Sequence, residues 1–135
     1  MNTYSLVIPV YNEENNINKL FKELVDVKLY EILEEIIFID DKSTDKTLTI
    51  IKQIVKVHNK VKLIKNNNNM GQSFSLYQGV KNSIGQTILT MDGDLQNDPL
   101  DFFKLIEHYN NKNKFKLVGG IRSNRKDTYI KKLSS

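Results

Sequence analysis

Acidic residues gather where apolar runs of this 135-residue chain end, and one such cluster has the spacing that metal chemistry needs. Asp92, Gly93, Asp94 and Gln96 directly follow the apolar run 87–91. On an extended chain, residues two apart point the same way, so Asp92, Asp94 and Gln96 are expected to converge. Two carboxylates and a neutral oxygen suit Mg²⁺ or Mn²⁺, which keeps open positions for phosphate oxygens. We therefore predict metal ligands here, with Gly93 letting a ligand approach the backbone closely.

A second acidic cluster, Ile39-Asp40-Asp41-Lys42-Ser43-Thr44-Asp45, follows the apolar run 35–39. Adjacent acids repel one another unless a cation, a donor-rich ligand or a helix N-terminus offsets the charge. Helix capping accounts for Ser43, Thr44 and Asp45, with Ser43 or Thr44 as the expected N-cap. It accounts less well for Asp40 and Asp41, so we expect at least one of this pair to contact a ligand.

Two further segments allow either a ligand or an ordinary structural role. Pro9-Val10-Tyr11-Asn12-Glu13 offers a ring for stacking on a nucleobase, or is a plain turn before a helix. Gly119-Gly120-Ile121-Arg122-Ser123-Asn124-Arg125 suits the grip of a phosphate, or is a solvated end. The residues alone leave both alternatives open.

The elements that position these segments alternate along the chain. Strands are predicted at 5–10, 35–39, 61–64, 87–91 and 116–118 from short, largely β-branched apolar runs. Between them, helical spacing is found at 17–25, 48–55, 72–83 and from 97 to 109. This order predicts one three-layer α/β domain over 1–135 with a mostly parallel sheet. In such sheets ligands bind beyond the carboxyl ends of the strands, where the clusters lie.

Composition and charge narrow the function classes. The chain has no cysteine, which excludes disulfides and thiolate metal sites, and no apolar run approaches the length of a bilayer span. Residues 122–132 hold five basic groups and one acid, which equals the whole net charge of +4, so a general nucleic-acid-binding surface is not expected. His58 and His108 are expected to be exposed and receive no role. The small-residue helix after Asn69-Met70-Gly71 is expected to pack close to the sheet.

Two rival α/β classes lack their signals. A signalling receiver domain carries its acidic pair after the first strand, and a dinucleotide-binding oxidoreductase carries a glycine-rich turn there. This chain has Pro9-Val10-Tyr11 at that point.

Taken together, the motifs resemble glycosyltransferase family 2, and within it the polyprenyl-phosphate glycosyltransferases. The segments that carry the resemblance are Pro9 to Glu13, Asp40 to Asp45, Asn69-Met70-Gly71, Asp92 to Pro99, and Gly120 to Arg125. They cover nearly the whole chain in the order that the family has. Lys42 departs from the pattern, since the family often has glycine or a small residue there.

The resemblance implies a GT-A fold and a set of site residues. The nucleoside pocket would be lined by Pro9, Tyr11, Glu13, Ile39 and Asp41. Asp92, Gly93, Asp94 and Gln96 would hold the metal and the diphosphate, with Asp94 and Gln96 as direct ligands. Arg122 would reach a phosphate and act with Asp92 and Asp94 in catalysis, and Arg125 and Lys132 are weaker candidates.

The resemblance also implies the reaction. A sugar would pass from a UDP- or GDP-linked donor to a polyprenyl phosphate, with a divalent metal, at the cytoplasmic face of a membrane. Members of the family continue well past 135 residues, so the chain is expected to be a fragment. The alternatives are a catalytically silent remnant that binds nucleotide sugar, and a family 2 transferase that acts on a saccharide hydroxyl.

Overall fold

The computed structural model describes residues 2–110, 117–120 and 130–132, and side chains for residues 2–108. The strands are β1 (Tyr4–Val10), β2 (Glu35–Asp40), β3 (Val61–Lys65), β4 (Thr87–Thr90), β5 (Leu117–Gly120) and β6 (Ile130–Lys132). The helices are α1 (Ile17–Asp26), α2 (Leu29–Ile32), α3 (Thr47–Val57), α4 (Gln72–Asn82) and α5 (Asp101–Asn110). The predicted alternation of strand and helix is confirmed. The short elements α2 and β6 were not predicted, because they are too short to show a period.

The strands form one sheet in the order β3-β2-β1-β4-β5-β6. Neighbours from β3 to β5 pair in parallel, and β6 pairs antiparallel with β5. The register places Val10, at the end of β1, beside Asp40, at the end of β2. Met91, just after β4, donates its N–H to the carbonyl of Val7 in β1. The loops that follow β1, β2 and β4 therefore start side by side at one edge of the sheet.

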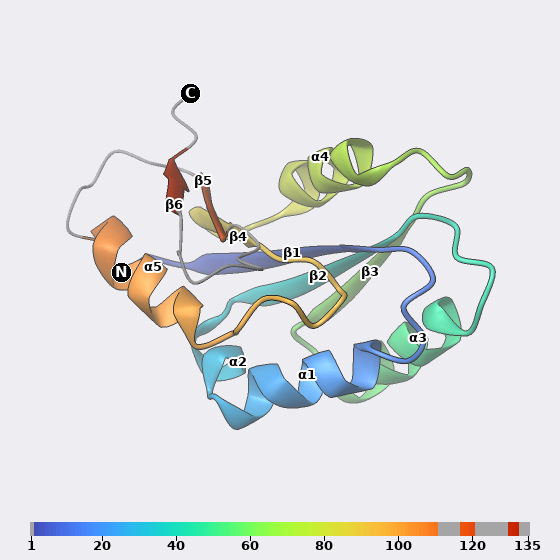
Figure 1. Cartoon of the computed structure of the whole chain (residues 1–135), viewed down its shortest axis with the longest axis horizontal. Coiled ribbons are helices and arrows are strands. Elements are labelled where there is room, and N and C mark those ends of the chain that lie inside the picture. Colours follow the sequence, from blue (N-terminus) through green and yellow to red (C-terminus); the bar gives the residue numbers. More distant parts are fainter. Residues whose placement is uncertain (1, 111–116, 121–129, 133–135) are drawn as a thin grey trace.

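The helices cover both faces of the sheet and make the predicted three layers. Figure 1 shows α4 above the sheet and α1, α2, α3 and α5 below it. Alternate residues of β1 point to opposite faces, so Leu6 and Ile8 join the large core beneath while Val7 joins the smaller core under α4. Over the part of the chain that the structure describes, none of these helices has the length and apolar character needed to cross a bilayer.

Helix α4 packs close to the sheet, as its small residues predicted. A Cβ added to Gly79 would meet Val7 Cγ1 at 2.3 Å and Ile39 Cδ1 at 2.8 Å. Ser75, one turn earlier, is also fully buried against the sheet. Gly79 and Ser75 thus allow a short distance between α4 and the sheet, and that short distance brings the first turn of α4 near the ends of β1 and β2.

Two local predictions were wrong. Ser43 and Thr44 do not cap α3, which begins at Thr47; instead their side chains bond to Asn12 in the neighbouring loop. His58 is half-buried, because its ring packs 4.6 Å from that of Phe21 and 5.7 Å from that of Tyr30. In both cases the contacting residue is distant in sequence, so the local sequence pattern could not predict the contact. His108 is exposed, as predicted.

The amino-terminal edge of the sheet holds a buried carboxylate, that of Glu35 at the start of β2. Its oxygens accept hydrogen bonds from Ser5 Oγ at 2.7 Å, the N–H of Ile84 at 2.7 Å and Lys62 Nζ at 2.5 Å. Burial opposes the charged form, but these donors outweigh it and lower the pKa of Glu35 below its ordinary value. The carboxylate therefore ties β1, β2, β3 and the loop before β4 together.

Candidate functional site

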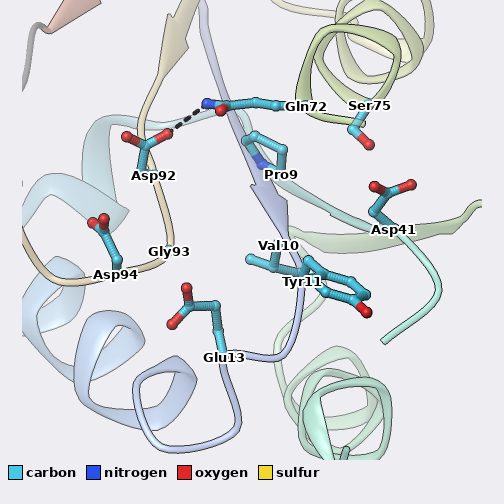
Figure 2. A pocket seen from close by; sticks show the side chains of 10 residues that line it. All are labelled: Pro9, Val10, Tyr11, Glu13, Asp41, Gln72, Ser75, Asp92, Gly93 and Asp94. Carbon is cyan, nitrogen blue, oxygen red and sulfur yellow. Dashed lines mark hydrogen bonds between the residues drawn. The ribbon is translucent and has the colours of Figure 1, made fainter. Parts of the chain in front are cut away.

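A pocket of about 190 Å³ lies at the carboxyl edge of the sheet, where the sequence clusters were expected to meet. Figure 2 shows it closed on one side by Asp92, Asp94 and Glu13 and on the other by Tyr11 and Asp41. The lining residues come from the ends of β1, β2 and β4 and from the first turn of α4; they are Pro9, Val10, Tyr11, Glu13, Asp41, Gln72, Ser75, Asp92, Gly93 and Asp94. The fold thus gathers segments from the N-terminus to beyond β4.

The loops after β1 and β2 are joined by side-chain hydrogen bonds. Asn12 has a left-handed backbone (φ 52°), and its N–H donates to Ser43 Oγ at 2.9 Å. Its Oδ1 accepts the N–H of Thr44 at 2.8 Å. The N–H of Glu13 donates to Thr47 Oγ1 at 2.8 Å. These bonds fix the positions of Tyr11 and Glu13 relative to β2, so Ser43, Thr44 and Thr47 have a structural role.

Asp45 belongs to the same structural set. Its Oδ1 accepts the N–H of Thr47 at 2.9 Å, and its Oδ2 accepts the N–H of Glu14 at 3.3 Å. Burial opposes ionisation of Asp45, but the hydrogen bonds from Thr47 and Glu14 outweigh it and lower the pKa. Internal donors therefore hold Asp45, an acid of the second cluster, in the charged form. The same is true of Asp41.

Asp41 lines the pocket and also anchors the loop that leads into α4. Its Oδ1 accepts from Asn66 Nδ2 at 2.9 Å and from the N–H of Met70 at 2.7 Å, and its Oδ2 accepts the N–H of Gly71 at 2.9 Å. Burial raises the pKa of this carboxyl, but the three donors outweigh burial and lower it. Asp40 points elsewhere: it is buried outside the pocket lining, and its Oδ2 accepts the N–H of Ser43 at 3.2 Å.

The acids after β4 reach the pocket, but Gln96 does not. Asp92 and Asp94 are half-buried in its wall, and Gly93 between them lies where a Cβ would meet Val10 Cγ1 at 2.8 Å. The predicted convergence of Asp92, Asp94 and Gln96 assumed an extended backbone. Instead the chain bends after β4, and Leu95 has a left-handed φ of 64°. Gln96 therefore lines a separate hollow beside α1.

The other expected residues are distributed as follows. Pro9, Tyr11, Glu13 and Asp41 all line the pocket, with the ring of Tyr11 46% exposed and accessible to a ligand. Ile39 is fully buried in the core under α4 and is not among the lining residues. Arg122 and Arg125 lie outside the described residues, and so does the side chain of Lys132 in β6.

Sequence reasoning missed Gln72 and Ser75, which line the pocket from the first turns of α4. Gln72 Nε2 donates to Asp92 Oδ1 at 2.8 Å (Figure 2). Ser75 Oγ accepts from Asn66 Nδ2 at 2.9 Å. A signal was present, because α4 follows β3 and its N-terminus must lie at the carboxyl edge. The helix was interpreted only for its packing.

The acidic wall suits a cation that arrives with a phosphate ligand. In the described part of the chain, no group of three or more His, Cys, Asp or Glu side chains is arranged to hold a metal ion. Asp92 and Asp94 provide two carboxylates on one pocket wall. Mg²⁺ is commonly held by one or two protein carboxylates, with substrate phosphates and water completing its shell. Asp92 and Asp94 therefore suit a metal site whose ligands come partly from a substrate phosphate, rather than one formed by protein ligands alone.

Comparison with known proteins finds relatives of this chain. The chain is 34% identical over 134 residues to the dodecaprenyl-phosphate galacturonate synthase of Rhizobium johnstonii, covering 97% of this chain and 39% of that protein. The chain thus spans about two fifths of this curated relative.

Solved structures show the same fold. Staphylococcus aureus TarS in complex with UDP-GlcNAc matches with a TM-score of 0.65 at 24% identity, over 81% of this chain and 31% of TarS. The mannosyltransferase PcManGT of Pyrobaculum calidifontis, in complex with GDP-Man and Mn²⁺, matches with a TM-score of 0.59 at 19% identity, over 69% of this chain and 28% of that one. The architecture is thus that of the GT-A glycosyltransferases.

The family model described as glycosyl transferase family 2 matches residues 5–135, nearly the whole chain. Its match includes every segment that lines the pocket. The chain therefore belongs to glycosyl transferase family 2.

Proposed function

We propose that this chain is the donor-binding part of a transferase that moves a sugar from a nucleoside diphosphate to a polyprenyl phosphate with the help of a divalent cation. One observation carries the proposal: a single pocket has the aromatic ring of Tyr11 and the carboxyl group of Asp41 on one side and two further acids on the other. A nucleoside diphosphate presents matching parts in that order, a flat base with N–H donors and then a charged diphosphate that brings its own cation.

The nucleoside would occupy the side formed by Pro9, Tyr11 and Asp41. The exposed ring of Tyr11 offers a stacking surface, and stacking of a base on an aromatic side chain contributes about 1–3 kcal/mol. Asp41 is held ionised, and its carboxylate has about four acceptor positions, of which internal donors use three. Oδ2, which among the described residues accepts the Gly71 N–H alone, would take an N–H of the base.

The diphosphate would lie beside Asp92 and Asp94. A bound Mg²⁺ or Mn²⁺ would neutralise the charge that builds on the departing diphosphate. Asp92 and Asp94 would hold that ion and orient the diphosphate, and Gly93 between them packs against Val10, where a Cβ would not fit. PcManGT, which shares the fold, has both GDP-Man and Mn²⁺ bound. Arg122, outside the described residues, would add a phosphate contact.

The acceptor assignment rests on chemistry and on the named relative. A phosphate monoester has a second pKa of about 6, so a lipid phosphate is largely ionised at neutral pH and attacks without a strong base. The R. johnstonii relative is named a dodecaprenyl-phosphate galacturonate synthase, and a polyprenyl phosphate as acceptor would give a product of that kind. The basic segment 122–132 would meet an anionic headgroup, where each nearby cation contributes about 1 kcal/mol.

A thermal-shift panel of UDP and GDP, with and without Mn²⁺, tests the donor site. Ligand at a hundred times its Kd should stabilise the folded chain by about 2.7 kcal/mol, and only when Mn²⁺ is present. Asp94→Ala should lose this stabilisation because it removes a carboxylate from the diphosphate side. Equal stabilisation of Asp94→Ala, or none for the wild type with either nucleotide, would contradict the proposal.

Transfer itself is tested separately with a nucleotide sugar and a polyprenyl phosphate. Release of nucleoside diphosphate that depends on the lipid identifies the proposed acceptor. Nucleotide binding without turnover would instead identify a binding part that has no activity by itself.

A further inference from the structure

Gln72 connects two walls of the pocket that come from distant parts of the chain. It is the first residue of α4, which lies on the opposite side of the sheet from α1 and α5. Its Nε2 donates to Oδ1 of Asp92, in the loop after β4, at 2.8 Å. Figure 2 shows the side chain reaching across the top of the pocket to that carboxylate. The contact joins α4 to the acidic wall directly.

Hydrogen bonds to buried residues fix the backbone that carries Gln72. Gly71, directly before it, has a φ of 91°, a conformation that favours glycine, and its N–H bonds to Asp41 at 2.9 Å. Ser75, one turn on, donates to the carbonyl of Gly71 at 3.0 Å and accepts from Asn66. The first turn of α4 is therefore held by buried partners, and Gln72 extends from a rigid base.

The chemistry of the side chain is suited to holding a carboxylate that must also bind a cation. An amide N–H donates a hydrogen bond without bringing a charge, whereas lysine or arginine would neutralise Asp92 and repel a metal ion. A donor on one carboxylate oxygen restricts rotation of the group and directs it into the pocket. Partners of this kind commonly change metal affinity tenfold to a hundredfold when they are removed.

We infer that Gln72 is a positioning residue that acts through Asp92, holding that carboxylate in the orientation needed for the cation and diphosphate. The inference rests on the proposed donor site. It adds a side chain from α4 to the diphosphate side of the site, which Asp92 and Asp94 of the loop after β4 provide. Gln72 contacts neither the reacting atoms nor the sugar in this assignment; its effect passes through Asp92.

The test measures binding of UDP and GDP to the full chain by calorimetry, with and without Mn²⁺. Gln72→Ala should weaken the Mn²⁺-dependent binding about tenfold. Gln78→Ala, on the same helix and away from this pocket, is the matched control and should bind as the wild type does.

A double-mutant cycle separates an action through Asp92 from a general effect on α4. In an Asp92→Asn background, Gln72→Ala should cause little further loss, because the carboxylate that it orients is already gone. An undiminished tenfold loss in that background, or wild-type binding by Gln72→Ala, would overturn the inference and leave the donor site intact. Absence of Mn²⁺-dependent binding in the wild type would overturn both together.

Discussion

The two edges of the sheet use carboxylates in opposite ways. At the amino-terminal edge, Glu35 is fully buried and accepts from Ser5, Ile84 and Lys62. At the carboxyl edge, Asp92 and Asp94 are half-buried in the wall of an open pocket. A buried carboxylate stabilises a fold only when its donors come from the protein. Asp92 and Asp94 also accept protein hydrogen bonds, from Gln72 and from the N–H of Gln96, but their place in the pocket wall lets a ligand reach them as well.

Asp41 lies between these two cases. It is buried like Glu35 and its pKa is lowered by internal donors, yet it also lines the pocket like Asp92. The residue therefore joins the scaffold to the site. The comparison teaches that neither burial nor internal donors separate a binding carboxylate from a structural one; its place in the pocket lining does.

Removal of Glu35 should have the largest effect on stability. Glu35→Ala leaves the buried Ser5 hydroxyl and the part-buried Ile84 N–H without their acceptor, and a buried donor left without a partner costs about 1–3 kcal/mol. Urea unfolding measures the loss. The neighbouring Glu34 is exposed, so Glu34→Ala should change stability by no more than about 0.5 kcal/mol.

The milder Glu35→Gln keeps the shape of the side chain. Its free energy of unfolding can therefore be measured even if Glu35→Ala does not fold. Asp94→Ala without ligand should leave stability nearly unchanged. If Asp94→Ala lowered the free energy of unfolding as much as Glu35→Ala does, the proposed difference between the two edges of the sheet would be wrong.

Acid should weaken the fold by protonating the buried carboxylates of Glu35 and Asp41, and the loss of stability should be smaller than that caused by Glu35→Ala. The pKa values of Glu35 and Asp41 are lowered in the folded chain from ordinary values of 4.5 and 3.8. The unfolded chain therefore binds protons first, so the stabilisation is complete above about pH 4.5 and is lost as the pH falls toward the folded pKa values. Urea midpoints between pH 7 and pH 3 should decline below that point, and less steeply in Glu35→Gln. Equal slopes in both proteins would contradict the assignment to Glu35.

The smallest effect is expected in the turn after β2. Lys42 has a φ of 58°, a left-handed conformation that costs a residue with a side chain about 1 kcal/mol. Lys42→Gly should therefore raise the free energy of unfolding by up to about 1 kcal/mol, which a urea midpoint resolves. Lys42→Ala is the control, since it loses the bond from Nζ to the carbonyl of Asn67 but keeps the strained backbone. Stabilisation of the alanine variant to the same degree would show that φ is not the cause.

The same turn bears on the one mismatch in the family resemblance. That resemblance implies that glycine or a small residue often stands where this chain has Lys42, and the backbone there adopts the conformation that glycine favours. A positive φ cannot be predicted from lysine itself. It follows from the turn that aligns Ser43 and Thr44 with Asn12.

The sequence by itself determined the order of the elements and which segments would meet. Apolar runs and helical spacing located β1 to β5 and the four longer helices, and parallel pairing places the segments after β1, β2 and β4 at one edge. These features follow from local periodicity and from the geometry of a parallel sheet, so a single sequence contains them.

Only the tertiary structure decided which side chains face the pocket and which are already paired. It turned Gln96 away through the left-handed Leu95, brought Gln72 to Asp92, and gave Asp41 its donors from Asn66, Met70 and Gly71. The reason is physical. These hydrogen bonds join residues 20 to 30 positions apart, and their formation depends on how closely α4 packs on the sheet.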